Sequence, residues 1–226
     1  MNEELAQFPY FTGKMLKAFL HKNQPSTTIT RWKDKFIQIE KGKYTVHQNP
    51  FIYASIIIRP SYISFRSALY FYQLTNQIPI RIEVMTPRYK QNTNELIFYT
   101  SKHIFGYEKT VVDTFDIFIA TKEKLLLDCL LYPKAGVMID ELDLLLKESL
   151  DLGRIVEYLK KINKLSLIKK CGYLLETQNM HIYEYFKQQI KEDKNYILLN
   201  SNKKKGKNIN HKWRLYDNEN RTSTNS

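Results

Sequence analysis

Apolar side chains recur at helical spacing near the start of the chain. Residues 11–22 place them on one side of a short helix that Thr12 caps. These apolar residues are Phe11, Met15, Leu16, Phe19 and Leu20. After a break at 23–25, Ile29, Trp32 and Phe36 are spaced three and four residues apart, which predicts a second helix.

The spacing then becomes that of strands. Residues 37–46 alternate apolar and polar side chains around a turn at 41–43, which predicts a β-hairpin. Two helices and a hairpin within so short a stretch predict a compact winged helix.

The pattern changes again after Pro50. A helix is predicted over 60–74, beginning at Ser61 or Ser64. Three strands are predicted next, because residues 78–85 alternate strictly and residues 95–100 and 114–120 are rich in β-branched and aromatic side chains.

From Thr121 onward the spacing is helical, and the clearest apolar stripe lies within 151–162. The predicted helical segments are 122–132, 139–150, 151–162, 165–176 and 181–190. The last 30 residues are polar and basic, with one predicted strand at 213–216, and Trp213 indicates that this tail packs back onto the core.

These elements predict an α+β protein. We expect an N-terminal winged helix-turn-helix domain over 1–50. It is followed by an α+β domain over 51–226, with a short sheet, a helical C-terminal half and a basic tail.

Positive charge is concentrated at both ends. The chain has 226 residues and a formal net charge of +12. Residues 1–47 carry 8 cationic and 4 anionic side chains, residues 187–226 carry 10 and 4, and residues 48–186 carry 17 and 15. Basic ends around a nearly neutral middle favour an anionic partner.

Composition argues against several classes of protein. Apolar residues make up 43% of the chain, which is enough for a core and argues against global disorder. No apolar run of membrane-spanning length and no signal-peptide pattern occurs, so we expect a cytoplasmic protein without a membrane partner. Cys129 and Cys171 lie in apolar helical patterns and are interpreted as reduced core residues.

Signatures of catalysis are scarce. The sequence has no nucleotide-binding glycine loop, no zinc-protease motif and no serine-hydrolase motif. The five histidines lack metal-ligand spacing. We therefore expect no enzyme activity, no catalytic residue, no cofactor and no metal.

A Mg²⁺-dependent nuclease is the catalytic alternative. Asp113 or Asp116 on a strand and Glu123 at the next helix start would meet at one sheet edge and hold the ion. We favour a structural role for Glu123, which follows the cap Thr121 and stabilises the helix N-terminus. Asp128, among leucines, requires a hydrogen-bond donor or water.

The predicted winged helix carries side chains suited to DNA. Its second helix would enter the major groove, where Arg31 suits a guanine edge, while Lys41 and Lys43 of the hairpin suit phosphates. The predicted DNA-binding residues are Thr27, Thr28, Thr30, Arg31, Lys35, Lys41 and Lys43. Two alternatives stay open, a merely solvated charged face and a winged helix that binds protein. The run at 203–207 either adds nonspecific phosphate affinity or is a solvated loop.

The order of these elements resembles that of AbiEi-type antitoxins of type IV toxin–antitoxin systems, over nearly the whole chain. Four motifs carry the likeness, and each is weak alone. They are Ser61–Leu69, Glu123-Lys124 with Leu127-Asp128, Gly172–Glu176, and Lys212-Trp213-Arg214.

The resemblance implies a transcription regulator with two activities. Its winged helix binds inverted repeats upstream of its own operon as an autorepressor. Its C-terminal domain counteracts a nucleotidyltransferase toxin that modifies RNA, without a stable complex. The candidates for antitoxin activity are polar surface positions in matching elements, namely Ser64, Arg66, Glu123, Lys124 and Lys170.

A transcriptional regulator without a toxin partner is a further alternative. The DNA-binding segment is short for a winged helix, and residues 1–10 are candidates for the missing structure.

Overall fold

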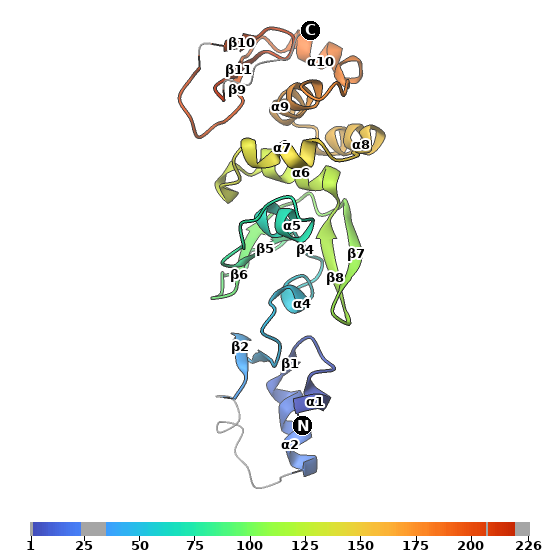
Figure 1. Ribbon diagram of the computed structural model, residues 1–226, viewed down its shortest axis with the longest axis vertical. Coiled ribbons are helices and arrows are strands. Elements are labelled where there is room, and N and C mark those ends of the chain that lie inside the picture. Colours follow the sequence, from blue (N-terminus) through green and yellow to red (C-terminus); the bar gives the residue numbers. More distant parts are fainter. Residues whose placement is uncertain (1, 24–34, 207, 220–226) are drawn as a thin grey trace. The chain divides into compact units, whose positions relative to one another are not determined.

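A computed structural model describes residues 2–23, 35–206 and 208–219 (Figure 1). Within these ranges the chain has a mixed α+β fold with nine α-helices and three β-sheets. It forms two compact units, the first made of Met1–Ser67 and Pro79–Ile119, the second of Ala68–Ile78 and Ala120–Ser226. The predicted domain boundary at residue 50 stays a prediction.

A small three-stranded sheet begins the first unit. Its middle strand, β3, pairs antiparallel with both β1 and β2. β2 and β3 form the predicted hairpin, whose turn places Gly42 at φ +81°. The elements here are α1 (Asn2–Leu5), β1 (Phe11–Thr12), α2 (Gly13–Asn23), β2 (Ile37–Glu40) and β3 (Lys43–Thr45).

An apolar cluster holds this small sheet against α1 and α2. Its buried members are Leu5, Phe11, Leu16, Leu20, Phe36 and Tyr44. The prediction that Phe11 lies in the first helix is wrong, because Phe11 pairs with Tyr44 in the sheet. Thr12 does cap α2, since its Oγ1 accepts from the Met15 N–H at 3.3 Å. Residues 1–10 contribute Leu5 to the cluster. Most of the second predicted helix lies outside the described residues.

A five-stranded mixed sheet forms the rest of the first unit, in the order β6-β5-β4-β8-β7. β4 pairs antiparallel with β5 and parallel with β8, whereas β5 and β6 are parallel. The elements are α4 (Phe51–Ala54), β4 (Tyr62–Ile63), α5 (Phe65–Phe71), β5 (Ile82–Thr86), β6 (Leu96–Thr100), β7 (Tyr107–Val112) and β8 (Phe115–Ala120). α5 carries the chain into the second unit.

Two predictions for this region need correction. The strand predicted over 78–85 begins only at Ile82, and the side chains of Ile78 and Ile80 are exposed. β5 has a neighbour on either side and is buried at all five positions, so its burial does not alternate. The helix predicted over 60–74 is shorter, because Tyr62 and Ile63 are in β4.

Helices dominate the second unit, where α6 contacts α8 and α9, and α9 also contacts α10 (Figure 1). The Thr121 hydroxyl caps α6 and the Asp151 carboxylate caps α8. The predicted helix over 139–150 is only a 3₁₀ turn and a short helix. The bonds at both ends of this segment span three residues rather than four, as from the Glu141 N–H to the Met138 carbonyl and from the Lys147 N–H to the Leu144 carbonyl. The helices are α6 (Lys122–Leu131), α7 (Asp143–Leu146), α8 (Leu152–Ile162), α9 (Leu165–Glu176) and α10 (Lys187–Glu192).

The basic tail is more ordered than predicted. It forms a sheet in the order β10-β11-β9, made of β9 (Ile197–Leu198), β10 (Asn208–Asn210) and β11 (Leu215–Asp217). Trp213 is fully buried, so the prediction that the tail packs onto the core is confirmed. Cys129 and Cys171 are both buried, and neither is in a disulfide. No helix in the described ranges is long and apolar enough to cross a membrane.

Candidate nucleic-acid interface and buried polar clusters

The hairpin of the first unit presents its lysines in different ways. Lys41 lies exposed at the turn, whereas Lys43 is held within the unit. The Lys43 ammonium donates to the Ile57 carbonyl at 2.8 Å and pairs with the Glu40 carboxylate at 2.7 Å. Lys35 is exposed just before β2. Lys41 is therefore the hairpin lysine best placed for a phosphate.

The remaining predicted DNA-binding residues lie in the segment that joins α2 to the hairpin. They are Thr27, Thr28, Thr30 and Arg31, and all four are outside the described residues.

A second segment of the first unit is bonded to the hairpin. Glu40 accepts a hydrogen bond from Lys90 as well as pairing with Lys43. Burial acts to raise the pKa of Glu40, but the hydrogen bonds from the two lysines outweigh it and hold the pKa below its ordinary value. The residues that follow Lys90 are thereby placed beside β2.

A polar groove of about 540 Å³ lies between these two segments. Gln38 and Lys41 line it from the hairpin, and Gln91, Asn92 and Asn94 line it from the other side. Amide and ammonium groups bind phosphates and base edges, so the groove has suitable chemistry for a nucleic acid. Sequence reasoning missed the three amides because only the fold places them beside the hairpin.

Ser64 and Arg66 lie beside a buried carboxylate, Glu83. Ser64 is buried, so its placement on the surface was wrong. The Ser67 N–H donates to Glu83 Oε2 at 3.3 Å, and the Glu83 N–H donates to Ser67 Oγ at 2.9 Å. Burial raises the pKa of Glu83 to about 7, although bonds from the backbone of Ser67 and Arg66 oppose the shift. Glu83 thus joins β5 to the start of α5.

The Tyr99 hydroxyl completes this cluster. It donates to Glu83 Oε1 at 3.5 Å. Phe65, which opens α5, has a left-handed backbone with φ +54° and is fully buried. The surroundings therefore hold a strained residue in place beside Glu83.

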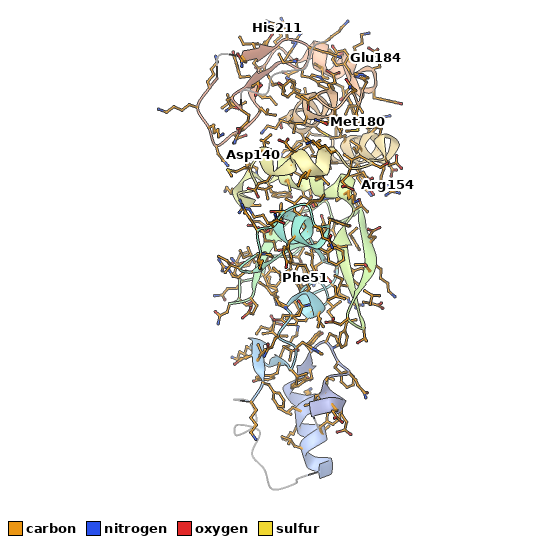
Figure 2. All side chains as sticks on the ribbon, in the orientation of Figure 1. Phe51, Asp140, Arg154, Met180, Glu184 and His211 are labelled. Carbon is orange, nitrogen blue, oxygen red and sulfur yellow. The ribbon has the colours of Figure 1, made fainter. Side chains whose placement is uncertain are left out.

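Glu123 and Lys124 of the second unit are also interior residues, which corrects their predicted surface position. The Glu123 carboxylate accepts from the Asp151 N–H at 3.1 Å and pairs with Arg154 at 3.5 Å. Arg154 is on α8, where Figure 2 labels it. Lys124 and Asp128 form an ion pair in which both side chains are fully buried. Asp128 thus has the donor that its apolar surroundings require.

Lys170 lies on α9 and is likewise buried. It lines a pocket of the second unit rather than a surface. The five candidates for antitoxin activity are thus spread over the β4–α5 connection, α5, α6 and α9.

The acidic residues of the nuclease alternative belong to two different units of the chain. Asp116 is exposed and pairs with Lys109 at 2.7 Å, and Asp113 lies in the turn before β8 with φ +55°. Glu123 belongs to the second unit and has the contacts given above. In the part of the chain that the structure describes, no three His, Cys, Asp or Glu residues are grouped to hold a metal.

Comparison with known proteins finds a likeness in fold. No protein-family model and no curated protein matches the sequence. The crystal structure of the Rv2827c protein from Mycobacterium tuberculosis is similar, with a TM-score of 0.71 over 96% of this chain and 89% of that chain. The two sequences are 13% identical, so the likeness concerns the fold alone.

Proposed function

We propose that the protein is an AbiEi-type antitoxin that represses its own operon and counteracts a nucleotidyltransferase toxin. The observation that carries the DNA-binding part is the exposed Lys41 at the turn of a hairpin whose sheet packs on α2 through a closed apolar cluster. A rigid hairpin with a cation at its tip is suited to contact the phosphate backbone beside a helix in the major groove.

Different residues of the N-terminal segment have different tasks in this proposal. Arg31 reads a base edge, because its guanidinium bonds guanine bidentately. Lys35 and Lys41 neutralise phosphates, which gives affinity without sequence preference. Lys43 positions the hairpin through Glu40 and the Ile57 carbonyl instead of reaching for DNA.

The proposed antitoxin activity is supported by the four sequence motifs that resemble those of AbiEi-type antitoxins and by the division of the chain into two compact units. In this proposal the protein opposes the toxin without forming a stable complex with it. Glu123 and Lys124 are buried in α6, so we assign them a structural role. Of the five candidates, Lys170 lines a pocket of the second unit. A regulator without a toxin partner is the competing function.

Fluorescence anisotropy with DNA from just upstream of the gene tests the first half of the proposal. Across a salt series, the full-length protein should prefer this DNA over a shuffled sequence by roughly a hundredfold or more. Arg31→Ala should reduce that preference, since a lost base contact costs about 1–3 kcal/mol on the correct sequence only. Equal, steeply salt-sensitive binding to both DNAs would contradict autoregulation.

Co-expression tests the second half. We expect a toxin-like reading frame next to the gene. Its expression should arrest growth, and co-expression of the full-length protein should restore growth. If growth is not restored while upstream DNA is still bound specifically, the protein is a regulator without antitoxin activity.

A further inference from the structure

A pocket in the second unit has a cation in its wall. It has a volume of about 420 Å³ and is lined by the end of α6, the first turns of α9 and strand β9. Leu130, Leu131, Leu167 and Ile197 supply an apolar wall. Lys170, Ser166 and Ser201 supply polar groups. Ligand pockets commonly combine a few polar groups with an apolar wall in this size range.

Lys170 is the unusual member of this lining. The residue is 8% exposed, and its ammonium donates to the Ser201 hydroxyl at 2.8 Å. Over the described ranges, no carboxylate lies within ion-pair distance of this ammonium. In this described part of the chain, the buried Lys170 ammonium is thus hydrogen-bonded to the neutral Ser201 hydroxyl instead of being paired with an anion.

Lys169, the residue before Lys170, is also buried but has a counter-charge. The Lys169 side chain is fully buried, but its ammonium pairs with the Asp193 carboxylate at 2.6 Å and donates to the Asn195 carbonyl at 2.7 Å. Two consecutive lysines of α9 are therefore both buried, and one of them has the anion that a buried cation requires. The other has a cavity beside it.

Burial without an anion has an energetic consequence. It lowers the pKa of Lys170, because the charged form loses its hydration and gains no counter-charge. An anion in the pocket would remove this penalty, so the free energy of ligand binding would include relief of a cost already present in the empty protein.

The helix supports the same kind of ligand. Ser166 and Lys170 are four residues apart on the face of α9 that lines the pocket. The residue that precedes the helix is Lys164, whose ammonium cannot cap the first-turn N–H groups, and it also lines the pocket. The N-terminus of a helix attracts negative charge.

We propose that this pocket binds a small organic anion, whose charged group contacts Lys170 and whose apolar part lies against Leu130, Leu131 and Leu167. A carboxylate and a phosphate monoester share this chemistry. The site is independent of the DNA interface, since all of its residues belong to the second unit.

Calorimetric titration of the full-length protein tests the proposal with matched probes. Hexyl phosphate and heptanoate each carry one anionic group on the same hexyl chain, hexanol lacks the charge, and inorganic phosphate lacks the chain. At least one hexyl anion should bind about tenfold or more tightly than hexanol and than inorganic phosphate. Equal binding of the hexyl anions and hexanol would overturn the role of the charge, and equal binding of inorganic phosphate would overturn that of the apolar wall.

Substitutions in the pocket test whether the anion binds at this site. Lys170→Met keeps an unbranched side chain that is one atom shorter and removes the charge, so it should weaken binding of the hexyl anion about tenfold or more. Lys204→Met, at an exposed lysine of the same unit, should bind as the wild type does. Unchanged binding by Lys170→Met would overturn the proposal. Leu131→Glu, which places a carboxylate in the half-buried wall, should also abolish binding and serves if Lys170→Met does not fold.

Discussion

The six-membered ring of Trp213 lies over Gly172 of α9, in the space that a Cβ on this residue would occupy. The indole is fully buried and meets the Tyr183 ring edge to face, with the ring centroids 5.2 Å apart. The C-terminal sheet is thus fixed to a helix through a position that lacks a side chain.

Gly172→Ala should therefore destabilise the second unit. Alanine favours a helix by about 1 kcal/mol over glycine, but its methyl group would overlap the indole, and overpacking of a core costs about 1–3 kcal/mol or more. Urea unfolding followed by circular dichroism should give a lower midpoint than the wild type. Gly13→Ala is the control, because nothing lies within 4 Å of a Cβ added there. A raised midpoint for Gly172→Ala would contradict the close packing.

The buried pair of Lys124 and Asp128 leads to a second prediction. Lys124→Met leaves a fully buried carboxylate without its cation and should cost about 3–5 kcal/mol of unfolding free energy. The double variant Lys124→Met, Asp128→Leu should recover most of that loss, because it removes both charges together. Guanidinium unfolding of the two single variants and the double variant completes the cycle. Additive losses would show that the two side chains act independently.

Glu83 should make stability depend on pH. Burial raises its pKa to about 7 from an ordinary value of 4.5, so between these values the folded state binds more protons than the unfolded state. The stabilising effect of the protonated Glu83 carboxyl is fully present below about pH 4.5. As the pH rises through about 7, this effect is lost and the free energy of unfolding falls by about 3 kcal/mol.

Glu83→Gln checks this directly. Its amide stays neutral, so the variant should gain stability relative to the wild type as the pH rises from 4.5 to 8. Urea unfolding at these two pH values measures the difference. Glu157→Gln, at an exposed position of α8, should follow the wild type. A constant difference between wild type and Glu83→Gln would mean that folding does not raise the pKa of Glu83.

Substitution of Lys41 should lower DNA affinity, whereas substitution of Lys43 should lower the stability of the hairpin. Lys41→Ala should weaken specific and random DNA alike and reduce the salt slope by about 1, because it removes one phosphate contact. Lys43→Ala should lower unfolding free energy by about 1 kcal/mol, because it removes the partly exposed pair with Glu40. Anisotropy over a salt series and urea unfolding measure the two effects. The assignment fails if Lys43→Ala changes the salt slope and Lys41→Ala does not.

Sequence periodicity predicted the elements that depend on one-sided burial. α8 is an example, because Ile155, Val156, Leu159 and Ile162 are buried and Asp151 caps it. The β2–β3 hairpin is another, since its turn contains a glycine with positive φ. β5 could not be delimited in this way, because an interior strand is buried on both faces.

Some of the polar clusters depend on partners that are distant in the sequence. Glu83 bonds Ser67, and Lys169 pairs with Asp193, at separations that no local pattern encodes. Lys169 and Lys170 are identical neighbours in the sequence, so only the fold distinguishes the neutralised lysine from the one beside a pocket. The amides at the hairpin groove were missed for the same reason.

The interleaved path of the chain limits how the protein can be divided. Residues 68–78 belong to the second unit although they lie between two parts of the first. A single cut after Ile119 would separate the second unit from this segment, and a cut after Ser67 would separate the first unit from its remaining strands. During synthesis, the first unit can close while residues 68–78 still await their packing partners. Truncated fragments are therefore poor substitutes for the intact chain in assays of either unit.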